Sequence, residues 1–380
     1  MTELIHGGDV VGYREAYGRE PLDFSANINP FGLPESARQA VIDSLAEADR
    51  YPDPLCRKLC RAIAEKEGVP AGYVLCGNGA ADLIFRLAAV KAPARPAGGA
   101  GPAGEGANAA ALVLAPTFAE YELALGGAGW RVTRHPLSPE NDFCLTEAIL
   151  RELTPEIGLL ALCNPNNPTG QLIEPELLER IVRRCRQLGI RVLLDECFLD
   201  FVEEGGKMTL AGRLAEFPNL LILKAFTKSY AMAGIRLGYL LCADSDLLEK
   251  LRLAGQPWGV SSLAQAAGAA ALGEEEYLER SRRAIAAENK RLRQAMRELG
   301  LQVIGSRANY LFFRGGPLDL AKRLKAGGVL IRSCDNYPGL APGYCRVAVR
   351  TREENDLLLA ALAGALKKQA PGSGRRIFNE

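Results

Sequence analysis

The sequence predicts an α/β protein whose main part is a doubly wound, mostly parallel sheet. Between about residues 35 and 275, helical segments alternate with short apolar runs that are typical of strands, namely YVLC, ALVLAP, GLLALC, RVLLDE, NLLILK and LGYLLC. Strands that are separated by helices form parallel sheets with both faces covered. We therefore expect a large domain at residues 46–259.

A smaller α+β domain is expected beside it. The segment EEEYLERSRRAIAAENKRLRQAMREL has apolar residues at helical spacing and predicts a long bridging helix. The runs ANYLFFR, GVLIRSC and YCRVAVR predict strands, and REENDLLLAALAGALKKQ predicts a closing helix. We assign residues 1–45, as an N-terminal arm, and 260–368 to this domain, with a flexible tail at 369–380 and a flexible Ala-, Gly- and Pro-rich insertion at 92–110.

Composition excludes several classes of protein. The 380 residues contain 46 Lys and Arg against 45 Asp and Glu, without a like-charge block, so neither nucleic acid nor a membrane surface is an expected partner. The start MTELIHGGDV lacks a signal-peptide pattern and no apolar run approaches the ~20 residues of a membrane span, which indicates a cytoplasmic protein. Ten cysteines without a Cys-x-x-Cys pair indicate neither a metal site nor a disulfide framework; Cys56 and Cys60, expected on one helix face, are interpreted as reduced thiols.

Two polar loops are expected at one edge of the sheet. In GNGAADLIFRLA, residues 77–88, a glycine turn precedes a helix whose free N–H groups could bind an anion, although such a turn is also an ordinary connection. CNPNNPTGQ, residues 163–171, follows a strand at the carboxyl edge, where open α/β folds bind ligands. A well-formed turn explains its prolines equally well.

Charged residues follow two further strands. Asp195 and Glu196 end RVLLDE, and a partly desolvated carboxylate there requires a cation or a donor. Without a His or carboxylate cluster, a protonated heterocyclic nitrogen fits better than a metal. Lys228 and Arg236, in KAFTKSYAMAGIRLGY, supply an amine for a Schiff base and a guanidinium for a phosphate. One ligand satisfies all these groups, and it is pyridoxal 5'-phosphate.

The motifs NPNNPTG, DECF and TKSYAMAGIRLGY resemble those of the fold-type I pyridoxal-phosphate-dependent aminotransferases (class I/II), in the histidinol-phosphate aminotransferase-like branch. Their order and spacing, 28 residues from Asn167 to Asp195 and 33 from Asp195 to Lys228, match that family. The resemblance covers nearly the whole chain apart from residues 92–110 and the tail.

The resemblance implies roles around the cofactor ring. Lys228 would hold the cofactor as a Schiff base and later move protons, and Asp195 would pair with the pyridine N–H. Asn167 would donate to the phenolic oxygen, and Phe118 in PTFAEY would stack on the ring. Phe198 departs from the pattern, because many relatives have a tyrosine there that also donates to this oxygen.

The same resemblance implies a phosphate cup. Arg236 and Thr227 would bind the phosphate together with the backbone turn at Gly79 and Ala80. Tyr51 in RYPDP would reach the phosphate of a neighbouring subunit, which implies a homodimer. Ala225 stands where relatives often carry a hydroxyl group, so Thr227 would carry more of that contact.

Substrate groups are implied as well. Arg346 matches the arginine that binds the substrate carboxylate, although Arg350 on the same strand could be structural. Arg332 matches the position that grips phosphate esters in this branch. Segments such as HGGD, LDFSANINPFG, DECFLDF and PWGVSSLAQ are similar to the group that decarboxylates L-threonine O-3-phosphate for cobalamin biosynthesis. In that group His6 would lie near the phosphate and Asn27 on the carboxylate side.

The expected reaction is therefore decarboxylation of L-threonine O-3-phosphate to (R)-1-aminopropan-2-ol O-phosphate and carbon dioxide. The alternative is a histidinol-phosphate aminotransferase or related enzyme that uses 2-oxoglutarate, since either reaction can use the same cofactor. A nucleotide-binding oxidoreductase is disfavoured because GNGAAD lacks the third glycine of its fingerprint. A non-catalytic module would give no reason to place these side chains at one sheet edge.

Overall fold

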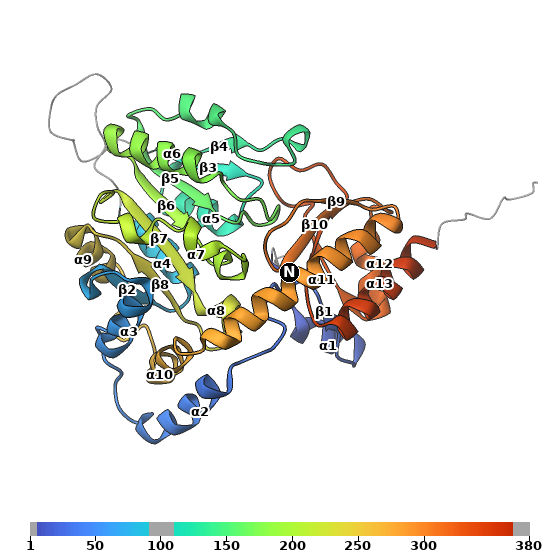
Figure 1. Cartoon of the computed structure of the whole chain (residues 1–380), viewed down its shortest axis with the longest axis horizontal. Helices are drawn as coiled ribbons and strands as arrows, with labels where there is room; N and C mark the ends of the chain where they lie inside the picture. Colours follow the sequence, from blue (N-terminus) through green and yellow to red (C-terminus); the bar gives the residue numbers. More distant parts are fainter. Residues whose placement is uncertain (1–5, 91–109, 368–380) are drawn as a thin grey trace, which may run out of the picture.

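The computed structural model describes residues 6–90 and 110–367 and is built around a seven-stranded sheet (Figure 1). In spatial order its strands are β2 (Val74–Gly77), β8 (Gly238–Leu241), β7 (Leu220–Ala225), β6 (Arg191–Asp195), β5 (Ile157–Cys163), β3 (Ala110–Ala115) and β4 (Arg131–Pro136). The six runs predicted from the sequence all form strands of this sheet.

Helices cover both faces of the sheet, as the near-continuous apolar strands require. One face packs against α3 (Arg57–Glu67), α6 (Pro175–Leu188) and α10 (Ser262–Ala271), and the other against α4 (Ala80–Ala89), α5 (Ala119–Gly127) and α9 (Ser245–Leu253). Alternate residues of each central strand join opposite clusters: Leu220 and Ile222 lie on the α3 side, whereas Leu221 and Leu223 lie on the α4 side. The predicted doubly wound fold is confirmed.

The sheet is parallel except for β8, which pairs antiparallel with both β7 and β2. Between β7 and β8 the chain forms only the short helix α8 (Phe226–Ser229) and a loop, so it lacks the long covering helix of a parallel crossover. The chain therefore turns back beside β7, and this connection contains both Lys228 and Arg236.

A second sheet lies beside the first and has the antiparallel order β12 (Arg332–Ser333), β13 (Tyr344–Ala348), β10 (Tyr310–Arg314) and β9 (Gln302–Ile304). Its apolar side packs on α11 (Glu275–Glu298), α12 (Leu320–Gly327) and α13 (Arg352–Lys367). Helix α11 runs from the region of α8 to this sheet (Figure 1). The predicted bridging and closing helices are thus confirmed.

The N-terminal segment ties the two sheets together. After α1 (Val10–Tyr17), β1 (Leu22–Asp23) pairs in parallel with β11 (Val329–Leu330), and the Asn29 N–H donates to the Lys228 carbonyl at 3.1 Å. Helix α2 (Glu35–Ser44) then packs against α10. Shorter helices are α7 (Gly205–Met208) and 3-10 turns at Leu45–Glu47, Ala71–Tyr73, Pro139–Asn141, Glu147–Arg151, Leu199–Phe201 and Ala211–Arg213.

Three local expectations need correction. GVLIRSC forms two short strands, β11 and β12, because Val329 and Leu330 pair with β1 whereas Arg332 and Ser333 pair with β13. Strands β1, β4 and β9 were not predicted. Cys56 does not lie on the helix with Cys60; it precedes α3 with a left-handed φ of 48°.

Several expectations stay predictions. The insertion at 92–110 falls outside the described residues except for residue 110, and so does the tail at 369–380. The division into domains at 46–259, 1–45 and 260–368 stays a prediction. Within residues 6–90 and 110–367, no helix has the length and hydrophobicity that crossing a membrane requires.

Candidate active site

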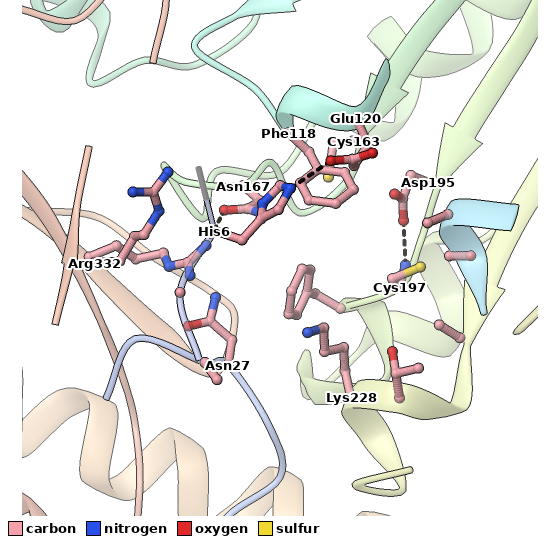
Figure 2. A pocket seen from close by; sticks show the side chains of 18 of the residues that line it. His6, Asn27, Phe118, Glu120, Cys163, Asn167, Asp195, Cys197, Lys228 and Arg332 are labelled. Carbon is pink, nitrogen blue, oxygen red and sulfur yellow. Dashed lines mark hydrogen bonds and ion pairs between the residues drawn. The ribbon is translucent and has the colours of Figure 1, made fainter. Parts of the chain in front are cut away.

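A cavity of about 380 Å³ opens where the carboxyl ends of β5, β6 and β7 face the second sheet. Its walls include residues from the N-terminal segment, both sheets and the starts of α4 and α5. Figure 2 shows Asp195 and Cys197 on one side, Arg332 and Asn27 on the other, and Lys228 between them. The cavity therefore brings together groups that lie more than 300 residues apart in the chain.

Lys228 lies on α8 with its amine in this cavity, 6.0 Å from the centre of the Phe198 ring. Burial lowers the pKa of its amine to about 8, and the nearby Arg346 and Arg236 guanidiniums add to this effect. A lysine with this pKa is partly neutral near pH 8 and can act as a nucleophile.

The other lysine of the same stretch has a different environment. Lys224 is buried on the opposite face of β7, where its Nζ contacts both carboxylate oxygens of Glu67 at 2.9 and 2.8 Å. Tyr239 donates to the same carboxylate at 2.5 Å. The neighbouring carboxylates raise the pKa of Lys224 although burial opposes them, so this lysine stays charged and structural.

Asp195, the last residue of β6, is buried at the bottom of the cavity. Its Oδ2 accepts from the Tyr121 hydroxyl at 2.5 Å, and its Oδ1 accepts from the Cys197 N–H at 2.9 Å. Burial raises the pKa of Asp195, whereas these donors and the Lys228 charge oppose the shift. A cation that is brought near Asp195 would therefore stabilise the ionised carboxylate.

The turn between β2 and α4 forms an anion cradle. Gly79 has a φ of 82°, which favours glycine, and a Cβ there would lie 2.6 Å from the Arg236 guanidinium and would displace it. Ala80 begins α4, whose first N–H groups have no partner within the helix. Thr227 and Arg236 line the cavity with Ala80, so a hydroxyl, a guanidinium and a helix N-terminus converge.

Arg346 lies on β13 and is held by the 163–171 loop and by the N-terminal segment. Its guanidinium donates to the Asn167 side-chain oxygen and, at 2.8 Å, to the Ser25 carbonyl. With its amide oxygen turned toward Arg346, Asn27 accepts from Nε at 3.2 Å and from Nη1 at 3.3 Å. The guanidinium also lies 5.5 Å from the centre of the Tyr310 ring. This arginine is therefore fixed in place beside the cavity.

Arg332 reaches the same cavity because it is the cross-strand partner of Arg346 in the β12–β13 pair. Its guanidinium donates to the Asn336 side chain at 2.8 Å and stacks over Tyr337, 5.2 Å from the ring centre. Two guanidiniums thus line one wall of the cavity, and Arg332 is nearer to its mouth, since it is the less buried of the two.

His6 lies across the cavity from the lysine. Its Nε2 is 2.6 Å from Glu120 Oε1, and its ring centre is 6.0 Å from that of Phe118. Phe118 caps the start of α5 and packs edge-on against Tyr121. The aromatic wall and the histidine therefore both depend on the position of α5.

Of the site residues predicted from the sequence, Tyr51 lies elsewhere. It is 81% exposed and stacks on Trp258, with the ring centres 4.6 Å apart. Gly79 does not line the cavity itself, but it lies next to the Arg236 guanidinium, which does. The remaining predicted residues line the cavity. A role for Tyr51 in the site of a second subunit stays a prediction. Phe198 and Ala225, the two departures from the family pattern, also line the cavity.

The donors and acceptors fit pyridoxal phosphate. Asp195 would face its ring nitrogen, Phe118 would cover its ring, and the Gly79–Ala80 turn with Thr227 and Arg236 would hold its phosphate, leaving the Lys228 amine for its aldehyde carbon. No group of His, Cys, Asp or Glu in the described part of the chain is arranged to hold a metal ion.

Sequence reasoning missed several residues of the cavity. Tyr121 comes three residues after Phe118, the N-cap residue of α5, but no local pattern indicates its contact with Asp195, which lies 74 residues away. Glu120 contacts His6, which lies 114 residues away in the sequence. Tyr337 lies only five residues after Arg332, but their stacking depends on the path of the chain after β12.

Comparisons with known proteins show the family of this chain. The family model "Aminotransferase class I and II" matches residues 19–362. Threonine-phosphate decarboxylase of Salmonella typhimurium is 40% identical over 98% of this chain and 99% of its own, and histidinol-phosphate aminotransferase of Desulfitobacterium hafniense is 35% identical over 90% and 91%. The crystal structure of the histidinol-phosphate aminotransferase from Clostridium acetobutylicum matches 91% of this chain and 99% of its own, with a TM-score of 0.82 and 25% identity. The chain belongs to the class I and II aminotransferase family, as the motifs predicted.

Proposed function

We propose that this protein is a pyridoxal-phosphate-dependent enzyme that decarboxylates L-threonine O-3-phosphate to (R)-1-aminopropan-2-ol O-phosphate and carbon dioxide, a step of cobalamin biosynthesis. The name of its 40% identical relative supports this assignment. The structural observation that most supports this function is the cross-strand pair of Arg332 and Arg346. It puts two guanidiniums on the wall of the cavity that contains the Lys228 amine.

Two guanidiniums suit a substrate with two anionic groups. Arg346 is buried and held by Ser25 and Asn167, so it can bind a carboxylate in one fixed orientation. Arg332 is nearer to the mouth and can bind a phosphate ester through its planar fork. An amino acid that carries a phosphate on its side chain would be held at both ends.

Further positive charge supports the phosphate end. A hollow of about 290 Å³ next to the cavity shares His6, Gly7, Ser25 and Arg332 with it. The residues that line this hollow include Lys322 and Lys325 of α12, whose two positive charges exceed the one negative charge of Asp9. An approaching dianion would therefore meet net positive charge before it reaches Arg332.

The cofactor, when bound, supplies the electron sink for the pair that remains at Cα after a bond there breaks. Asp195 supplies a buried negative charge for the ring nitrogen, and Tyr121 and the Cys197 N–H orient that carboxylate. Lys228, with its lowered pKa, can accept and return a proton near Cα. Phe118 and Phe198 cover the cavity with apolar surface, which strengthens these electrostatic interactions.

The choice of bond depends on how the substrate is held. A grip on both the carboxylate and the phosphate limits rotation about the Cα–N bond, and that rotation decides which bond aligns with the ring. The alternative function is a histidinol-phosphate aminotransferase, which the name of the 35% identical relative supports. That reaction would use the same Lys228, Asp195 and Arg346.

We also propose that the enzyme is a cytoplasmic homodimer in which Tyr51 of the partner subunit reaches the cofactor phosphate. The exposure of the Tyr51 and Trp258 stack, with Leu55 43% exposed nearby in sequence, supports an interface on this face. Light scattering should give twice the 40.9 kDa mass of one chain, and a monomeric active enzyme would contradict the proposal.

Arg332→Ala tests the role of the arginine pair. We expect kcat/KM for threonine phosphate to fall about 10- to 100-fold, as for loss of a hydrogen bond between charged groups, without change in cofactor affinity. Arg314→Ala is the matched control, because Arg314 lies exposed on strand β10 of the same sheet and stacks over Tyr344. Loss of cofactor affinity without loss of substrate affinity in Arg332→Ala would contradict the assignment.

A further inference from the structure

A second cavity, of about 300 Å³, contains three cysteines that the proposed reaction does not use. Cys56, Cys60 and Cys76 all line it, together with Arg86 and Arg252. It shares no lining residue with the active-site cavity. Such a gathering of thiols in one cavity outside the active site requires its own explanation.

Local structure explains how the thiols meet. Cys56 precedes α3, Cys60 lies one turn into this helix, and Cys76 is on the face of β2 that packs against α3. The Sγ atoms of Cys60 and Cys76 are 3.7 Å apart. Because no described residues form a metal-binding cluster of His, Cys, Asp or Glu, the thiols are not arranged as a metal site.

The two contacting thiols differ in chemistry. Cys60 is partly exposed, and its pKa is lowered by the hydrogen bond from Cys76, with Arg252 adding to the effect against burial. Cys76 is buried, and its neighbouring thiols and burial raise its pKa well above the usual value. Cys60 is therefore the nucleophile of the pair, and Cys76 is positioned to resolve what forms on it.

We propose that Cys60 and Cys76 form a peroxide-sensitive dithiol site that closes to a reversible disulfide. The Cys60 thiolate attacks one oxygen of hydrogen peroxide, the O–O bond breaks, and Cys60 becomes a sulfenic acid as hydroxide leaves and is protonated to water. The Cys76 sulfur then attacks the Cys60 sulfur and loses its proton, the S–O bond breaks, and a second water leaves. Two thiols are oxidised by two electrons, and one hydrogen peroxide is reduced to two waters.

The position of Cys76 connects this site to the anion cradle between β2 and α4. Cys76 is followed directly by Gly77, Asn78 and Gly79, the turn against which Arg236 packs. A disulfide requires its sulfurs about 2.05 Å apart, so they must approach by roughly 1.7 Å from their 3.7 Å separation. The end of β2 would be drawn toward α3, and the cradle would lose part of its fit to a phosphate group.

The first test is chemical and does not depend on turnover. The reduced, cofactor-loaded protein is treated with hydrogen peroxide, quenched by alkylation under denaturing conditions, and digested without reduction for mass spectrometry. We expect a peptide pair linked through Cys60 and Cys76 that dithiothreitol separates, and no such pair in Cys60→Ser or Cys76→Ser. Cys144 is the matched control, because it is the other partly exposed thiol and burial raises its pKa.

Three results would overturn the dithiol site: a Cys56–Cys76 link instead, oxidation of Cys60 to the sulfinic acid without a link, or oxidation of Cys60 that is no faster than that of Cys144.

The effect of the disulfide on the anion cradle rests on the proposed cofactor and is measured separately. Fluorescence titration of the cofactor-free protein should show pyridoxal phosphate bound at least about threefold more weakly after oxidation, and no change in Cys60→Ser. Equal affinity with the disulfide formed would refute the coupling and leave the dithiol site intact.

Discussion

Lys228 is the residue on which the cofactor assignment depends. With a pKa of about 8, its amine should be about tenfold more neutral at pH 9 than at pH 7, and the rate of cofactor attachment to cofactor-free protein should rise and then level off above pH 9. With a lysine of unperturbed pKa, about 10.4, the rate of attachment would continue to rise above pH 9. The rate is measured by stopped-flow absorbance, with acetyl-lysine amide as the control for titration of the cofactor itself.

Borohydride reduction of the loaded protein should fix the cofactor on the peptide that contains Lys228, and Lys228→Ala should remove this product. Lys224 is the internal comparison, because it is in the same stretch but pairs with Glu67. Attachment to Lys224 would contradict the assignment.

Tyr121 is predicted to hold Asp195 ionised. Tyr121→Phe removes a donor to the carboxylate, so the pKa of Asp195 should rise further and turnover should fall about tenfold, as expected for one charge-assisted hydrogen bond. The loss should shrink as the pH rises, because the carboxylate ionises again above its raised pKa. Asp195→Asn, with cofactor still bound, should cost at least ~100-fold at every pH.

The pH–rate profiles of the two variants distinguish a positioning role from a structural one. A Tyr121→Phe loss that is the same at all pH values would mean that the hydroxyl only supports packing. Unchanged turnover in Asp195→Asn would refute the role of Asp195 itself.

At the scale of elements, a charged cluster joins β6, β7 and α3 on the sheet face opposite the active site. Glu196 Oε2 accepts from Thr209 at 2.8 Å, but Oε1 has no partner among the described residues. Burial raises the pKa of Glu196 to about 7, although Lys224 opposes the shift. The folded protein therefore keeps a proton that the unfolded chain releases at lower pH.

This pKa predicts how stability changes with pH. The contribution of protonated Glu196 is complete below the unfolded pKa of about 4.5 and is lost as the pH rises through about 7, so the free energy of unfolding should fall by up to about 3 kcal/mol over this range. Glu196→Gln should remove this part of the pH dependence. Urea unfolding of cofactor-free protein between pH 5 and pH 8 measures it, and parallel curves for both proteins would contradict the assignment.

The sequence predicted best those elements that have an uninterrupted apolar pattern. All central strands of the large sheet and the helices α11 and α13 were expected, because their burial is visible as runs or helical spacing. Strand β4 was missed since it lies at the sheet edge and most of its side chains are exposed, which leaves no apolar run. The division of GVLIRSC depends on two distant partner strands, so no local pattern could reveal it.

The same difference between local patterns and contacts of distant segments applies to the active site. Lys228, Asp195, Asn167 and the glycine turn could be placed because each ends a recognisable strand, and parallel strands bring these ends to one edge. The contacts of Asp195 with Tyr121 and of His6 with Glu120 join residues that are 74 and 114 positions apart, so they follow from tertiary packing. They required the structure.

At the scale of the whole molecule, the cavity lies between two sheets, and each contributes a different part of the chemistry. The large sheet positions the Lys228 amine, the Asp195 carboxylate and the anion cradle. The second sheet positions the arginine pair, Arg332 and Arg346. The N-terminal segment joins them, since the Asn29 N–H donates to the Lys228 carbonyl and the Phe24 carbonyl accepts from the Ala348 N–H. Substrate orientation therefore depends on how these parts are held together.

The central claim, that this arrangement removes the carboxylate of a phosphorylated amino acid, is tested most directly by carbon dioxide release. The loaded enzyme is given carboxyl-labelled L-threonine O-3-phosphate without any 2-oxo acid, and histidinol phosphate with 2-oxoglutarate in parallel. We predict stoichiometric labelled carbon dioxide and 1-aminopropan-2-ol O-phosphate from the first mixture. Turnover of the second mixture alone would contradict the account and establish the aminotransferase instead.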